Sequence, residues 1–156
     1  MSNVEITAAA VMQLRDHTGA GMMDCKKALI EAQGDAEKAV EILRQKGLKK
    51  SAEKAARVAN EGIVIASINE DKTFGVMVEI NCETDFVAKT DAFVDFAKNV
   101  LTEVQTSKPA TIEGFLNSPA SYEKNKTVAD TAAELTGKIG EKIAIKRFAR
   151  LDAQSG

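Results

Sequence analysis

Tryptophan is absent from this chain of 156 residues, which has only one His and two Cys. The missing tryptophan removes one of the side chains that most often dominate protein interfaces. One His and two Cys do not make a convincing zinc site. Cys25 and Cys82 lie far apart in apolar patterns, so they do not indicate a disulfide framework. We therefore expect no metal site and no cofactor.

Long apolar runs are also missing. No segment is apolar enough to cross a membrane, and no charged segment followed by an apolar one marks a signal peptide. The first residues, Met1 to Glu5, resemble a plain cytosolic start, so we expect a cytoplasmic protein with no membrane partner. The formal net charge is −2, which does not indicate nucleic acid as a direct partner.

Motifs of common enzyme families are lacking as well. There is no P-loop, no dinucleotide fingerprint and no G-x-S-x-G sequence. Cys82, His17 and Asp85 would be the only candidates for a thiol triad, but Cys82 falls on the apolar face of a predicted strand, where nothing supplies charge to stabilise a thiolate. His17 falls at a predicted helix end, where an imidazole commonly interacts with the helix dipole. We expect a protein that is not an enzyme.

The chain does have enough apolar residues, 44% of the total, for a packed core. Residues 5–46 predict three short helices: Thr7 to His17, Met22 to Gln33, and a third that Asp35 caps and Gly47 ends. Short loops and small apolar faces are typical of a compact three-helix domain, which we place at residues 1–47.

Residues 48–60 are rich in alanine and basic side chains, and predict a helical linker. The basic side chains between residues 46 and 57 could bind phosphates, but without interleaved aromatic residues they favour a solvated helix face. They are Lys46, Lys49, Lys50, Lys54 and Arg57.

From residue 61 to residue 156 we predict an α+β unit with a three-stranded antiparallel sheet packed with helices. The predicted strands are 63–68, 74–82 and 143–151, and residues 69–72 form a hairpin turn. Residues 91–106 have the clearest amphipathic helical spacing. A helical turn is expected at 111–116, and a further helix from Val128 to Gly137 or Gly140.

The end of the second strand is unusual. Phe74 to Cys82 alternate between apolar and other residues, and the alternation stops at the polar Glu83, Thr84 and Asp85, which favour a turn. Phe86 and Val87 then place two large apolar groups on an expected loop. Phe86 could fold back over the sheet while Asp85 caps the turn, or the two could project as a wedge into another protein. The residues alone favour the first.

Met22 and Met23 leave a similar choice open. Consecutive helix positions point about 100° apart, so the two cannot be equally buried. One could fill the core of the bundle, or one or both could be adaptable apolar contacts at the surface.

Three segments resemble signatures of the elongation factor Ts family. Residues 14–29 (LRDHTGAGMMDCKKAL) resemble the first signature, residues 79–88 (EINCETDFVA) the second, and residues 140–143 (GEKI), followed by a basic strand, a weaker third. Their order and spacing also match, and the first two are long and specific.

This resemblance implies a guanine nucleotide exchange factor for elongation factor Tu in translation elongation. It implies a ubiquitin-associated-like domain at residues 1–47, the linker at 48–60 and the N-terminal core subdomain at 61–156. Residues 84–87 would enter the nucleotide-binding G domain of Tu, in its nucleotide-free or GDP form, near the magnesium site, with Asp85 and Phe86 as the wedge. The partner-binding residues implied are Arg15, Met22, Met23, Asn81, Cys82, Thr84, Asp85, Phe86 and Val87.

Family members usually continue past the third strand, whereas this chain stops at Gly156. We therefore expect a fragment or a short form, and homodimerisation is not carried over. The alternative function is a non-catalytic interaction module that binds a ubiquitin-like or other partner through the three-helix domain.

Overall fold

The computed structural model of this chain describes residues 5–153, which form seven helices and one three-stranded antiparallel sheet. The α+β class predicted from the sequence is confirmed. Residues 1–4 and 154–156, with the predicted N-terminal start and the outer ends of both predicted domains, lie outside the described residues. No helix among the described residues has the length and apolar character needed to cross a membrane. The helices are α1 (Ala8–Thr18), α2 (Met22–Glu31), α3 (Ala36–Lys54), α4 (Asp85–Ala88), α5 (Asp91–Ser107), α6 (Ile112–Leu116) and α7 (Val128–Ile139), and the strands are β1 (Glu61–Ile68), β2 (Phe74–Cys82) and β3 (Ala144–Asp152).

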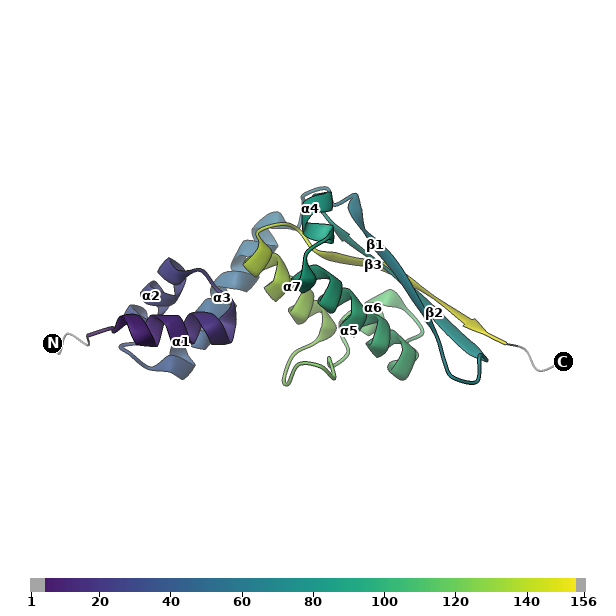
Figure 1. The fold of residues 1–156 in the computed structure, drawn as a ribbon, viewed down its shortest axis with the longest axis horizontal. Coiled ribbons are helices and arrows are strands. Elements are labelled where there is room, and N and C mark those ends of the chain that lie inside the picture. Colours follow the sequence, from purple (N-terminus) through teal and green to yellow (C-terminus); the bar gives the residue numbers. More distant parts are fainter. Residues whose placement is uncertain (1–4, 154–156) are drawn as a thin grey trace.

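The first three helices form a bundle at the N-terminal end of the molecule (Figure 1). Side-chain caps begin α1 and α3: Thr7 Oγ1 accepts a hydrogen bond from Ala10 N at 3.2 Å, and Asp35 Oδ1, the predicted cap, accepts one from Lys38 N at 3.1 Å. These side chains satisfy backbone N–H groups that have no partner within the helix. The buried residues of the bundle form a cluster of their own: Val11, Leu14, Cys25, Ala28, Leu29, Ala32 and Ala39.

The third helix is longer than the sequence predicted. It does not end at Gly47 but continues to Lys54, so the first part of the predicted linker belongs to α3. The residues after Gly47 include Leu, Lys, Ala and Glu, which favour helices, so a single glycine is tolerated. α3 also packs against α7, where Gly47 meets Gly137. In Figure 1, α3 leads from the bundle to the sheet-containing part of the molecule.

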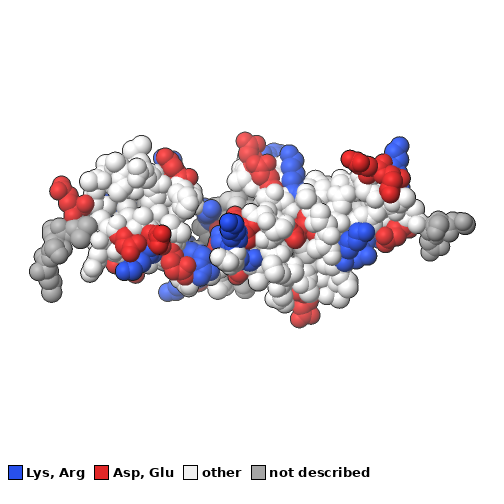
Figure 2. Space-filling model, turned by 90° about the horizontal axis from the view of Figure 1, so that it is seen from below, with Lys and Arg blue, Asp and Glu red and all other residues white. Residues whose placement is uncertain are grey.

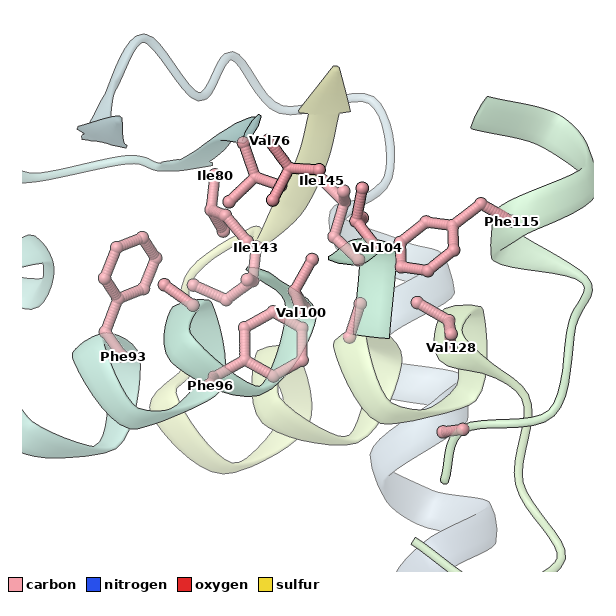
Figure 3. Packing of buried hydrophobic residues seen from close by; sticks show 14 of the residues in the cluster. Val76, Ile80, Phe93, Phe96, Val100, Val104, Phe115, Val128, Ile143 and Ile145 are labelled. Carbon is pink, nitrogen blue, oxygen red and sulfur yellow. The ribbon is translucent and has the colours of Figure 1, made fainter. Parts of the chain in front are cut away.

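The sheet has the strand order β1-β2-β3, with β2 in the centre. β1 and β2 form a hairpin in which Ile63 pairs with Ile80 and Ile68 with Gly75. Helices α5 and α7 lie on one side of the sheet (Figure 1). Figure 3 shows the core between them: Phe93, Phe96, Val100 and Val104 of α5 lie against strand residues such as Ile80 and Ile145.

The central strand is buried on one face. Phe74, Val76, Val78, Ile80 and Cys82 are all buried, as the alternation predicted. This face fixes β2 against the helices through the hydrophobic effect. The C-terminal end of β2, where the candidate site begins, therefore rests on a packed core.

Candidate functional site

The segment after β2 is a single helical turn, α4, and not the loop that the sequence predicted. Thr84 caps this turn: its Oγ1 accepts a hydrogen bond from Val87 N at 3.4 Å, and its carbonyl accepts one from Ala88 N at 3.3 Å. A threonine with extended backbone followed by an acidic residue is a typical helix start. α4 lies at the end of the sheet nearest α3 (Figure 1).

Phe86 points into solvent. Its side chain is 79% exposed, so the interpretation in which it covers the sheet is wrong. The two neighbouring positions of the turn differ: Val87 is half-buried against the core and Ala88 is buried. The turn thus directs one large apolar side chain outward while its other apolar positions hold it on the protein.

Asp85 lies beside Phe86 at the start of the turn. Its Oδ2 accepts a hydrogen bond from Lys89 Nζ at 2.9 Å. This bond and the positive charge of Lys89 lower the pKa of Asp85, and the carboxylate in turn raises the pKa of Lys89. Asp85 is therefore ionised at neutral pH, and an exposed phenyl ring and a negative charge lie side by side.

The polar atoms of Thr84 are all bound. Its N–H donates to Glu141 Oε2 at 3.0 Å, its hydroxyl donates to Glu141 Oε1 at 2.7 Å, and its carbonyl accepts from Cys82 Sγ at 3.1 Å. Glu83 N also donates to Glu141 Oε2, at 3.1 Å. Sequence reasoning did not name Glu141 as a site residue, although it belongs to the weak third signature at residues 140–143.

The surroundings of Cys82 are those of a buried structural residue and not of a nucleophile. Cys82 is fully buried, and burial is the main reason that its pKa is raised, followed by the negative charge of Glu141. A raised pKa keeps the sulfur as a thiol, which opposes a role as nucleophile. Asn81, the residue before it, donates from Nδ2 to Ala59 O at 3.2 Å. Cys82 therefore holds the base of the turn, and Asn81 connects β2 to the segment before β1. The predicted place of both residues in a partner site stays a prediction.

A second group of predicted site residues lies in the bundle, apart from α4 (Figure 1). Met22 and Met23 at the start of α2 are 44% and 64% exposed, and Arg15 on α1 is exposed as well. The question that the sequence left open is thus answered: neither methionine fills the core, which is occupied by Cys25 and Leu29 of the same helix.

The basic side chains around the predicted linker are partly paired with acids. Lys46 binds Glu31 at 2.7 Å, Lys50 binds Asp24 at 3.1 Å, and Arg57 binds Glu83 at 3.4 Å. On the face shown in Figure 2, lysine and arginine side chains lie among aspartates and glutamates. These pairs favour a solvated helix face over a phosphate site. Among residues 5–153, no group of three or more His, Cys, Asp or Glu side chains could hold a metal ion.

Comparison with known proteins connects this geometry to a family. Residues 83–156 match the family model described as "Elongation factor TS". The chain is 53% identical to an elongation factor Ts of Clostridium perfringens over 151 residues, which are 97% of this chain and 49% of that protein. It is 49% identical to elongation factor Ts of Clostridium kluyveri and 48% identical to that of Clostridium botulinum, with the same coverage. The chain thus spans about half the length of these curated relatives, and over nearly all of its own length its resemblance to the elongation factor Ts family is confirmed.

Proposed function

We propose that this chain acts as a guanine nucleotide exchange factor for elongation factor Tu, and that it acts through α4. The observation that carries the proposal is Phe86, which is 79% exposed on a turn whose base is held by Glu141 and Cys82. An apolar side chain held outward on a rigid base suits insertion into a partner. The names of the relatives support this choice of partner.

The magnesium site of the partner's G domain would be the target. Mg²⁺ requires near-octahedral oxygen ligands and tolerates their displacement poorly. The Phe86 ring, entering between elements of the G domain, would shift these ligands without binding the metal. The nucleotide phosphates would then lose part of their neutralising charge, and GDP would leave.

Binding of this chain and of GDP would be reciprocally coupled. If the chain weakens GDP binding by a given factor, GDP weakens binding of the chain by the same factor. The chain would therefore engage the GDP form but bind the nucleotide-free form most tightly, and GTP that enters the empty site would displace it. This mechanism requires no covalent chemistry from the chain.

The bundle would provide a second contact with the G domain. Met22 and Met23 are exposed, and methionine side chains adapt readily to apolar surfaces. Arg15 is exposed on α1 and can pair with acidic groups of the partner. Contacts at both ends would fix the direction from which α4 approaches.

Stopped-flow release of a fluorescent GDP from elongation factor Tu, with and without this chain, tests the proposal. The parent chain is expected to accelerate release, and Phe86→Ala to lose most of the acceleration. Leu151→Ala is the matched control, because Leu151 is 77% exposed on β3. This variant should accelerate GDP release as much as the parent chain does. A Phe86→Ala chain as active as the parent contradicts the wedge mechanism.

A second candidate function is an interaction module in the bundle alone. Apart from Met22 and Met23, the bundle also exposes Met12 and Ile30, and exposed apolar side chains of this kind can form a docking face. Binding of the chain to nucleotide-free elongation factor Tu and to ubiquitin separates the two functions. Capture by ubiquitin alone favours the module.

A further inference from the structure

We propose that Glu141 is a positioning residue, which sets the direction of Phe86 by holding the two residues before α4. This inference rests on the proposed function of Phe86 and deepens it. Glu141 lies 57 and 58 residues away from Thr84 and Glu83 in the chain. Its role thus depends on how the fold brings the start of β3 to the end of β2.

One carboxylate binds three donors here. Glu141 Oε2 accepts from Glu83 N at 3.1 Å and from Thr84 N at 3.0 Å, while Oε1 accepts from Thr84 Oγ1 at 2.7 Å. Hydrogen bonds to an ionised acceptor are stronger than neutral ones, and two backbone donors on one oxygen fix the backbone direction. Glu141 therefore restrains the main chain where it leaves β2.

This restraint reaches Phe86 through Thr84. The hydroxyl that donates to Glu141 also accepts from Val87 N, and the Thr84 carbonyl accepts from Ala88 N. The two hydrogen bonds that begin the turn are thus accepted by the residue that Glu141 holds. The exposed Phe86 side chain keeps a fixed direction only if the backbone of the turn that carries it stays in one conformation.

Glu83 provides a contact in the opposite direction. Its Oε1 accepts from Lys142 N at 2.7 Å, so the segments at the end of β2 and before β3 hold each other by side chain and main chain. Lys142 Nζ then donates to the carbonyls of Ala55 and Arg57, at 2.7 and 3.0 Å, at the end of α3. The residues before α4 are therefore connected both to the segment before β3 and, through Lys142, to the segment that follows α3.

The first test is a double-mutant cycle on GDP release. Glu141→Ala is expected to slow stimulated release about tenfold, the effect of losing charged hydrogen bonds at a partly exposed site. Glu141→Gln should stay within about threefold of the parent, because its amide oxygen can accept the two N–H groups and its amide nitrogen can donate to Thr84 Oγ1. Glu70→Ala, at an exposed position of the hairpin turn, is the control and should match the parent.

In the Phe86→Ala background, Glu141→Ala should cause no further loss, because Glu141 acts through Phe86. Two results overturn the proposal. One is that Glu141→Ala lowers the rate of stimulated GDP release by the same factor in the parent and in the Phe86→Ala background. The other is that Glu141→Ala stimulates release as fast as the parent. A purely structural role would give independent effects and would lower the stability of the whole chain.

The second test does not depend on exchange activity. Amide hydrogen exchange at Val87 and Ala88 should become about tenfold faster in Glu141→Ala, with exchange at the β2 amides unchanged. Unchanged exchange at Val87 and Ala88 overturns the positioning role. If the parent chain fails to accelerate GDP release from elongation factor Tu, the proposed function fails. Amide hydrogen exchange at Val87 and Ala88 then still decides whether Glu141 holds the turn.

Discussion

At the scale of single residues, the exposed Phe86 and the buried Phe93 have opposite relations to stability. Phe86 is 79% exposed, whereas Phe93 of α5 is fully buried. We expect Phe86→Ala to change the free energy of unfolding by no more than about 0.5 kcal/mol. Phe93→Ala, the comparison variant, should lose about 3–5 kcal/mol, because it leaves a cavity in the core. Urea unfolding of both variants measures this, and a loss of several kcal/mol in Phe86→Ala would show that the ring is part of the packing.

Cys82 offers a second prediction at this scale. Burial raises the pKa of its thiol, so less thiolate is present at pH 8 than in an exposed cysteine. In a Cys25→Ser chain, we therefore expect iodoacetamide to alkylate the folded protein slowly and the unfolded protein quickly. Mass spectrometry over time measures the reaction. Rapid alkylation of folded protein that rises with pH near neutrality would favour a thiol enzyme instead.

The same residues show how far the sequence could predict the site. Alternation in β2 correctly predicted which side chains are buried. It could not predict that Phe86 is exposed, because an apolar ring after a core strand is more often part of the core. Glu141 was missed because its partners are distant in the chain, and only the third signature pointed to its segment.

At the scale of elements, Glu83 connects three segments. Its Oε1 accepts from Lys142 N before β3 and from Arg57 Nη1 after α3. These bonds, that of Lys142 first, lower the pKa of Glu83 below its usual 4.5. A lowered pKa in the folded state means that the stabilisation is fully present above about pH 4.5. It is lost as the pH falls through the folded value.

We therefore expect the stability of the parent chain to exceed that of Glu83→Gln most at neutral pH. The difference should shrink as the pH falls below 4.5, because the protonated parent carboxyl then also lacks its charge. Thermal unfolding of both chains between pH 7 and pH 3 measures this difference in stability. Protonation of the other carboxylates changes the stability of both chains alike and cancels in the difference. A difference that stays constant over this range would contradict the assignment to ionised Glu83.

The two elements that the sequence mispredicted were mispredicted for different physical reasons. Gly47 was taken as a helix end from its low helix propensity, and residues 84–87 as a loop from their polar start. In the structure, packing on α7 keeps α3 helical through Gly47, and the Thr84 cap makes residues 85–88 a helical turn. In the first case, the helix-favouring residues after Gly47 and the contact with α7 outweighed the low helix propensity of glycine. In the second case, a cap was overlooked.

At the scale of the whole molecule, two separate hydrophobic clusters are joined by the contact of α3 with α7. Two glycines meet at this contact. A Cβ built on Gly137 would lie 2.7 Å from Gly47 Cα and 2.9 Å from Gly47 O, whereas a Cβ on Gly47 would meet nothing within 4 Å. The two helices can therefore cross this closely only while residue 137 lacks a side chain.

This asymmetry gives a matched pair of variants. Alanine favours a helix over glycine by about 1 kcal/mol, so Gly47→Ala should stabilise the chain by up to that amount. Gly137→Ala gains the same propensity but forces backbone apart, and we expect a net loss of about 1–3 kcal/mol. Urea unfolding measures both, and amide hydrogen exchange in α3 around Gly47 should increase only in Gly137→Ala. If Gly137→Ala were as stable as Gly47→Ala, the two helices would not be in close contact in solution, and the bundle would be free to move relative to the sheet that carries α4.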